Sequence, residues 1–120
     1  MSRNPALTEK FRTLLAQLTS LTVSGSLHWE RQINSAHRYA RWNNNLLILG
    51  PDAPLEDHKT PRYLFITPFN APTCIEITSD DKELRAPLLA LVYAVEAATA
   101  NQEPRDPFAL TQDALSGLLQ

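Results

Sequence analysis

Residue types that could bind an anionic or aromatic ligand are concentrated between His28 and Asn45 of this 120-residue chain. Arginine can pair with phosphate or carboxylate through two parallel hydrogen bonds, aromatic rings stack on bases, and asparagine reads polar edges. A hairpin in this segment would present several of these side chains together and could bind a nucleotide or single-stranded nucleic acid. The candidate binding residues are Arg31, His37, Arg38, Tyr39, Arg41, Trp42, Asn43, Asn44 and Asn45.

The same segment also has a purely structural interpretation. Trp29 shares the alternation of the apolar residues before it, which predicts that it lies in the core, and Trp42 can join it there. The arginines would then lie solvated on the outer face of a sheet or packed over aromatic rings. The chain lacks the glycine-rich aromatic motif of RNA-recognition sheets and carries a net charge of -2. Nucleotide binding is therefore the alternative hypothesis.

Metal and cofactor binding are not supported by the spacing of potential ligands. His28, His37 and His58 include no pair at the i, i+4 spacing of a helical site and no neighbouring cluster of ligands. Cys74 is the only cysteine, so the chain can form no intramolecular disulfide and no cysteine-based cluster. We therefore predict no metal and no cofactor.

Catalysis has little support in the sequence. Cys74 alternates with apolar neighbours in a predicted strand, where a free cysteine is usually a small buried hydrophobe. The chain has three glycines and no Gly-x-Ser-x-Gly element, so it lacks both a phosphate-cradling loop and a nucleophile turn. The adjacent acids at 56–57 lie in a loop, and those at 80–81 lie at a predicted helix start, where acids are ordinary capping residues. We predict that the protein is not an enzyme.

The first half of the chain predicts a helix followed by strands. Apolar residues recur at helical spacing over 5–19, after Asn4 as a cap. Alternation then predicts a strand over 21–30, with a bulge or a close backbone approach at Gly25, and a returning strand over 37–42. Asn43 to Asn45 form either a tight turn or a polar bulge, and a short apolar strand follows at 46–49.

The second half predicts a loop, a hairpin and two helices. Three prolines block regular structure over 50–61, and strands follow at 63–69 and 73–78. A helix opens after Ser79, Asp80 and Asp81, with either a kink at Pro87 or a short turn at 80–85 before a fresh helix. A last helix is predicted to begin at 106–107 and to carry Phe108, Leu110, Leu115, Leu118 and Leu119.

This order predicts one α+β domain over residues 1–120. It has an N-terminal helix, an antiparallel sheet of four to five strands and two C-terminal helices packed on one face. The layout is similar to that of the small acidic α+β dimers that act as secretion chaperones. Those proteins place a helix in mid-sheet, and residues 50–61 are too rich in proline to supply it, so nothing is carried over from that family.

Composition leaves protein binding as the leading function. Hydrophobic residues make up 43% and charged residues 20%, as in an ordinary globular chain. Residues 1–49 carry six basic and two acidic side chains, whereas residues 50–120 carry five basic and eleven acidic ones. Apolar helix faces left over in so small a chain are commonly buried in a dimer or a partner. We predict a non-enzymatic adaptor, inhibitor, immunity protein or assembly chaperone that binds another protein and forms a homodimer.

The expected compartment follows from the absence of targeting segments. The N-terminus has no continuous apolar stretch of the kind found in secretory signals. The longest mainly apolar window, 86–100, is too short to span a bilayer and contains Pro87 and Glu96. We expect a cytoplasmic protein without a membrane partner, with delivery by a leaderless secretion route left open.

Overall fold

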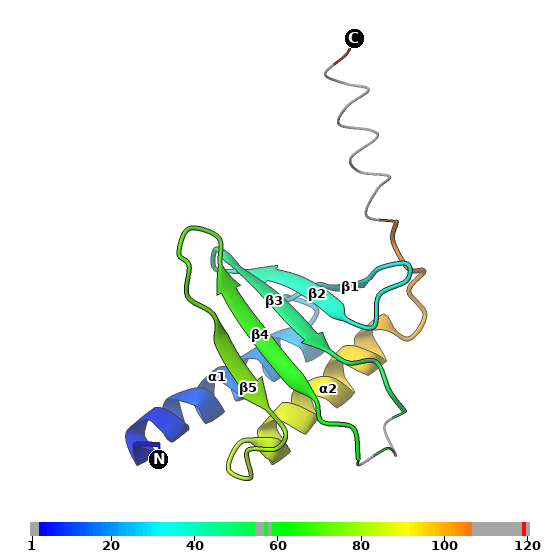
Figure 1. The fold of residues 1–120 in the computed structure, drawn as a ribbon. Coiled ribbons are helices and arrows are strands. Elements are labelled where there is room, and N and C mark those ends of the chain that lie inside the picture. Colours follow the sequence, from blue (N-terminus) through cyan, green and yellow to red (C-terminus); the bar gives the residue numbers. More distant parts are fainter. Residues whose placement is uncertain (1–2, 55–56, 58, 107–118, 120) are drawn as a thin grey trace.

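The described part of the protein has an α+β fold in which one helix precedes a five-stranded antiparallel sheet along the sequence and a second helix follows it (Figure 1). The computed structural model describes residues 3–54, 57, 59–106 and 119. The strands follow one another as an antiparallel meander in the order β1-β2-β3-β4-β5, which confirms the predicted class and sheet type. The elements are α1 (Pro5–Val23), β1 (Trp29–Arg31), β2 (Arg38–Trp42), β3 (Asn45–Gly50), β4 (Tyr63–Pro68), β5 (Ile75–Thr78) and α2 (Arg85–Thr99).

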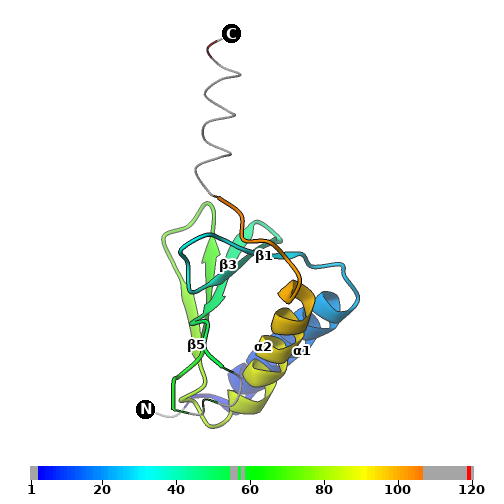
Figure 2. The same cartoon turned by 90° about the vertical axis from the view of Figure 1, so that its right-hand side faces the viewer.

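Both helices lie on the same side of the sheet (Figure 2). Strand alternation sends one set of side chains toward them, such as Leu47 and Leu49 of β3 and Leu64 and Ile66 of β4. Trp29 is 2% exposed, so its predicted place in the core is confirmed. The buried apolar core consists of Leu15, Leu18, Leu27, Trp29, Ala40, Leu47, Leu49, Leu64, Ile66, Ile77, Leu84, Leu88, Leu91, Val92 and Val95.

Helix α1 runs further than the sequence predicts. Asn4 caps it, because its side-chain oxygen accepts a hydrogen bond from the backbone N–H of Ala6 at 2.8 Å. The predicted strand start at residue 21 is wrong, since the helix continues to Val23 and ends before Gly25, which has a φ of 81°. The buried Thr22 hydroxyl donates to the carbonyl of Leu18 and accepts the indole N–H of Trp29, at 2.7 and 2.9 Å. These contacts stabilise the helical rather than the extended form of this segment.

Two open alternatives are resolved by backbone geometry. Asn43 and Asn44 have φ angles of 47° and 61°, which gives a tight turn between β2 and β3 rather than a bulge. Of the two alternatives for the segment after residue 79, the short turn followed by a fresh helix is confirmed: α2 begins at Arg85, after a turn in which the Leu84 N–H donates to the Asp81 carbonyl. Pro87 therefore lies in the first turn of α2, where its missing N–H leaves no gap in the helix.

The predicted last helix falls on residues 107–118, outside the described residues. In the part of the chain that the structure describes, α2 is the only helix that follows the sheet. Within the same residues, no helix combines the length and the apolar character needed to cross a membrane.

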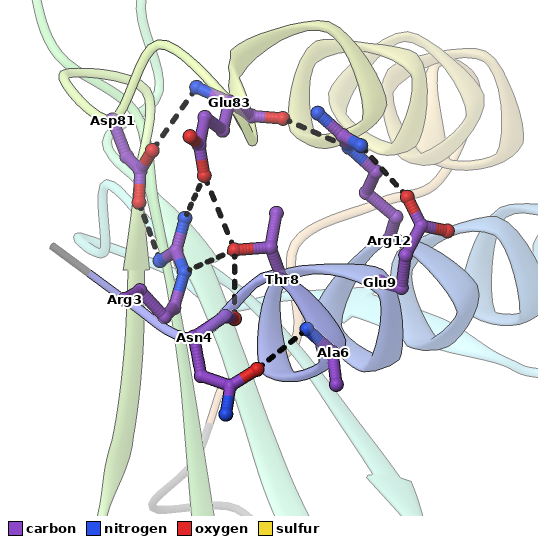
Figure 3. A network of polar contacts seen from close by, with 8 residues as sticks. All are labelled: Arg3, Asn4, Ala6, Thr8, Glu9, Arg12, Asp81 and Glu83. Atoms are coloured by element: carbon purple, nitrogen blue, oxygen red, sulfur yellow. Dashed lines mark hydrogen bonds and ion pairs between the residues drawn. The ribbon is translucent and has the colours of Figure 1, made fainter.

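A polar network joins the N-terminal segment to the turn before α2 (Figure 3). The Arg3 guanidinium lies 2.6 Å from Asp81 Oδ2 and 3.2 Å from Glu83 Oε2, and its Nε donates to the Thr8 hydroxyl at 2.8 Å. The Thr8 hydroxyl lies 3.1 Å from Glu83 Oε2. The hydrogen bond from Arg3 holds the pKa of Asp81 below its ordinary value. Asp81, one of the two acids predicted to cap the helix, therefore forms an ion pair that links the segment before α1 to the turn before α2.

Candidate functional site

Strand β2 distributes the predicted binding residues over two faces of the sheet. Arg38 and Ala40 are buried beneath the helices, and Trp42 packs partly buried against the same core. Tyr39 and Arg41 alternate with them and point to the opposite face. The candidate cluster is therefore not one surface. Of the candidates, Tyr39 and Arg41 in β2 and His37 just before it lie on the face that the described helices leave uncovered.

Arg38 is an internal ion-pairing residue. It is 6% exposed, and its Nη2 lies 3.4 Å from both Asp52 Oδ1 and Glu96 Oε1. Its Nε donates to the hydroxyl of Thr99 at 3.3 Å. The expectation that this arginine lies solvated or over an aromatic ring is wrong, because acids from α2 and from the loop after β3 neutralise it beneath the sheet.

Arg31 lies at a sheet edge that the chain itself covers. The Gln102 side chain accepts a hydrogen bond from the Arg31 backbone N–H at 2.6 Å and donates to the Trp29 carbonyl at 2.9 Å. The Arg31 guanidinium donates to the Gln102 carbonyl at 3.3 Å, and Arg105 forms a parallel bridge with Gln32. The outer edge of β1 is therefore paired, and the sequence contains no local signal for this contact.

The three asparagines serve the turn between β2 and β3. The Asn45 side chain donates to the Asn43 carbonyl at 2.8 Å, and the Asn44 carbonyl accepts the N–H of Phe69 at 3.1 Å. Arg41 follows the sequence expectation, since its guanidinium lies 5.8 Å from the ring centroid of Phe69. The asparagine backbone shapes this end of the sheet.

The uncovered face carries an apolar row across its centre. The register places Tyr39 beside Ile48 and Ile48 beside Phe65, all three partly buried, with Glu30 and Glu76 at the two ends. A second row runs through Arg41, Leu46 and Thr67 by the same pairings. We call the following residues the outer face: Tyr39, Arg41, Leu46, Ile48, Tyr63, Phe65 and Thr67.

A hydrogen-bonded aromatic group extends this row across β3. The Nε2 atom of His37 lies 2.6 Å from the Tyr63 hydroxyl, and the rings of Tyr63 and Phe65 are 4.9 Å apart between centroids. Gly50 makes room for this arrangement, because a Cβ atom at that position would overlap the His37 ring. Sequence reasoning found His37 but missed Tyr63 and Phe65. Their alternation with the buried Leu64 and Ile66 was the available signal.

Beside β1 and β2 the sheet is hollowed. A depression of about 690 Å³ lies on the side of Tyr39 and Arg41. It is bordered by Glu30 and Arg105, which form a 3.0 Å ion pair. The lining residues are Ser26, His28, Glu30, Gln32, Tyr39, Ala40, Arg41, Leu46 and Arg105. The hollow combines an aromatic wall, two guanidinium groups and one carboxylate.

The groups considered for catalysis are held in structural contacts or lie apart from one another. Cys74 is exposed, which contradicts its expected burial, because β5 begins only at Ile75 and the thiol lies before the strand. Its Sγ lies 3.6 Å from the Thr67 hydroxyl. Asp57 accepts bonds from the hydroxyl of Thr60 and from the backbone N–H of Lys59, which lower its pKa. Among the described residues, no three His, Cys, Asp or Glu side chains are grouped so that they could hold a metal.

Comparison of the chain with protein-family models, with curated proteins and with solved structures finds no match.

Proposed function

We propose that the protein is a non-enzymatic module that binds another polypeptide through the outer face. The observation that carries the proposal is the contiguous apolar row of Tyr39, Ile48 and Phe65, on a face that no described element covers. Isolated surface hydrophobes are ordinary, but a contiguous apolar patch with a polar rim is typical of interaction sites. Glu30 and Glu76 form two sides of that rim.

The size of the outer face indicates a modest interface. Five strands of three to six residues, about 4.8 Å apart and rising about 3.4 Å per residue, present roughly 400 Å². A standard specific interface takes about 800 Å² from each partner, and smaller ones are typical of transient complexes. The proposed module therefore binds and releases its partner, as an adaptor, inhibitor or chaperone does. Arg41 over Phe69 adds a rigid cationic contact at one corner, of the kind enriched at binding hot spots.

Differential capture tests the proposal. The wild-type chain and two variants, Arg41→Glu and Phe65→Glu, are immobilised and exposed to an extract of the natural host. A Tyr93→Lys variant serves as the matched control, because Tyr93 is an exposed aromatic residue on α2, away from the outer face. The proposal expects a polypeptide that wild type and control retain and both outer-face variants lose. Equal retention by all four, or no retained polypeptide, contradicts it.

The predicted homodimer stays a prediction, and a second copy is the first polypeptide to test. Sedimentation equilibrium distinguishes a 13.5 kDa chain from a species of twice that mass. If the second copy occupies the outer face, the dimer dissociates in the Phe65→Glu variant and persists in the Tyr93→Lys variant. A monomer at all concentrations removes the homodimer and leaves binding of a different protein.

A nucleotide or single-stranded nucleic acid is the second candidate, favoured by the hollow beside β1 and β2. Tyr39 offers a ring for stacking, and Arg41 and Arg105 offer cations for phosphate. Anisotropy of a short labelled oligothymidine, measured at two salt concentrations, tests this function. The candidate requires a rise at low salt that is lost in the Arg41→Ala, Arg105→Ala double variant, and no rise removes it.

A further inference from the structure

The two edge strands of the sheet, β1 and β5, differ in whether the chain covers their outward backbone groups. At β1 the Gln102 side chain bonds to the backbone of Trp29 and Arg31, and Arg105 continues the pairing. Strand β5 is the opposite terminal strand. Outside the sheet, the backbone of β5 accepts a hydrogen bond from the Asp81 N–H at the Thr78 carbonyl and one from the Cys74 thiol at the Ile75 carbonyl. In the part of the chain that the structure describes, the outward backbone groups of β5 other than the Thr78 carbonyl are therefore available for pairing.

On the helix side of the sheet this edge carries apolar side chains, and the one charged residue of β5, Glu76, lies on the outer face. Ile75 is 41% exposed, although the register places it on the core side of the sheet beside the buried Ile66. Helix α1 lies on that side, and its first turns project beyond β5 in Figure 1. In these first turns Leu7 is 44% exposed and Phe11 is partly buried.

We propose that β5 binds an extended segment of the partner polypeptide as a sixth strand. Main-chain hydrogen bonds to β5 would supply the register, as in other cases of strand addition. Alternate side chains of the segment would point toward the helix side of the sheet and cover Ile75, so these positions are apolar. The side chains between them point to the other side, where a basic residue can pair with the exposed carboxylate of Glu76.

The size of the edge decides between a peptide and a second copy of the chain. Four residues at about 3.4 Å each, in a layer about 10 Å thick, present roughly 140 Å². A stable two-fold dimer needs about 800 Å² from each copy, so pairing of β5 with itself is too small to hold one together. A short strand bound by its backbone and by two or three side chains fits this area. The inference rests on the proposed function, because it specifies the form of the partner.

Selection from a displayed library of random eight-residue peptides tests the inference. The wild-type chain is expected to enrich peptides with apolar residues at alternate positions. An enriched peptide, resynthesised, should bind Ile75→Lys about tenfold or more weakly, because the lysine places a charge at the apolar edge. It should bind Tyr93→Lys and the outer-face variant Arg41→Glu as it binds wild type. In an antiparallel pair, every second backbone N–H of the peptide would donate to β5. Methylation of those nitrogens should abolish binding, whereas methylation of the nitrogens between them should leave binding unchanged.

Two outcomes overturn the inference without touching the proposed function. One is that no peptide prefers wild type to the Ile75→Lys variant, while host-polypeptide capture still depends on Arg41 and Phe65. The other is a concentration-dependent dimer that the Ile75→Lys substitution dissociates, which would identify a second copy as the occupant of the edge. In a third outcome, peptide binding depends on Ile75, but capture of the host polypeptide is unchanged by the Arg41→Glu and Phe65→Glu substitutions. That result would support the edge site and would rule out the outer face as the docking surface.

Discussion

Replacing Gln102 by leucine tests the claim that the chain seals one edge of its sheet. The substitution removes an acceptor 2.6 Å from the Arg31 N–H and a donor 2.9 Å from the Trp29 carbonyl, and it keeps the side chain at a similar size. Each such hydrogen bond contributes about 1 kcal/mol net, so the free energy of unfolding should fall by about 2 kcal/mol. With an unfolding entropy of about 2.1 cal/mol/K per residue, the midpoint of thermal unfolding of this 120-residue chain should fall by roughly 8 °C.

The assay is urea and thermal unfolding followed by far-ultraviolet circular dichroism, with Asn101→Leu as the matched control. Asn101 is exposed in the same turn, so its replacement should change the free energy of unfolding by less than about 0.5 kcal/mol. A second readout is sedimentation velocity, in which Gln102→Leu should self-associate through the opened β1 edge and the control should not. Equal stability of Gln102→Leu and the control would refute the role assigned to this contact.

Three further predictions concern the interior and the turns. Gly50→Ala should lower the unfolding midpoint because its Cβ overlaps the His37 ring, and the double variant with His37→Ala should lose less than the sum of the single effects in thermal unfolding. Thr22→Val leaves the buried indole N–H of Trp29 without its acceptor, so urea unfolding should show a loss of about 1–3 kcal/mol, whereas Thr22→Ser should show almost none. The lowered pKa of Asp81 means that its contribution to stability is complete above 3.8, its ordinary value, and is lost as the pH falls through the folded-state pKa. The difference in unfolding free energy between wild type and Asp81→Asn should therefore shrink on acidification, and a difference that grows would contradict the assignment.

Sheet strands with strong local signatures could be predicted from sequence. The apolar run before Gly50, the hairpin at 63–78 and the asparagine turn each carry their own information in neighbouring residues. Pro87 also restricted α2 to a start in its immediate neighbourhood, because proline fits only the first turn of a helix.

The boundary between α1 and β1 depended on contacts that no local pattern contains. Leu21 fits both the helical stripe of α1 and the alternation of the following segment. The bond between the Thr22 hydroxyl and the Trp29 indole stabilises the helical form, and it joins residues seven positions apart. Periodicity alone therefore overextended the strand.

The candidate site was predicted in composition but not in arrangement. The alternation of side chains along β2 places Arg38 and Arg41 on opposite faces of the sheet. Which of the two faces the helices depends on distant acids such as Glu96, which pairs with Arg38. The Gln102 contact joins residues 71 positions apart and leaves no trace in local spacing. The outer face became recognisable only when the register brought Ile48 and Phe65 beside Tyr39.

The most direct test of the outer face is photo-crosslinking from within it. A photoreactive benzoylphenylalanine replaces Tyr39 in the chain produced in its natural host, and the same residue replaces Tyr93 on α2 in a parallel strain. If the outer face binds the partner, a crosslinked adduct of one defined mass forms from position 39 and none forms from position 93. Adducts of equal yield at both positions, or none from position 39, would contradict the assignment of the outer face as the polypeptide-binding surface.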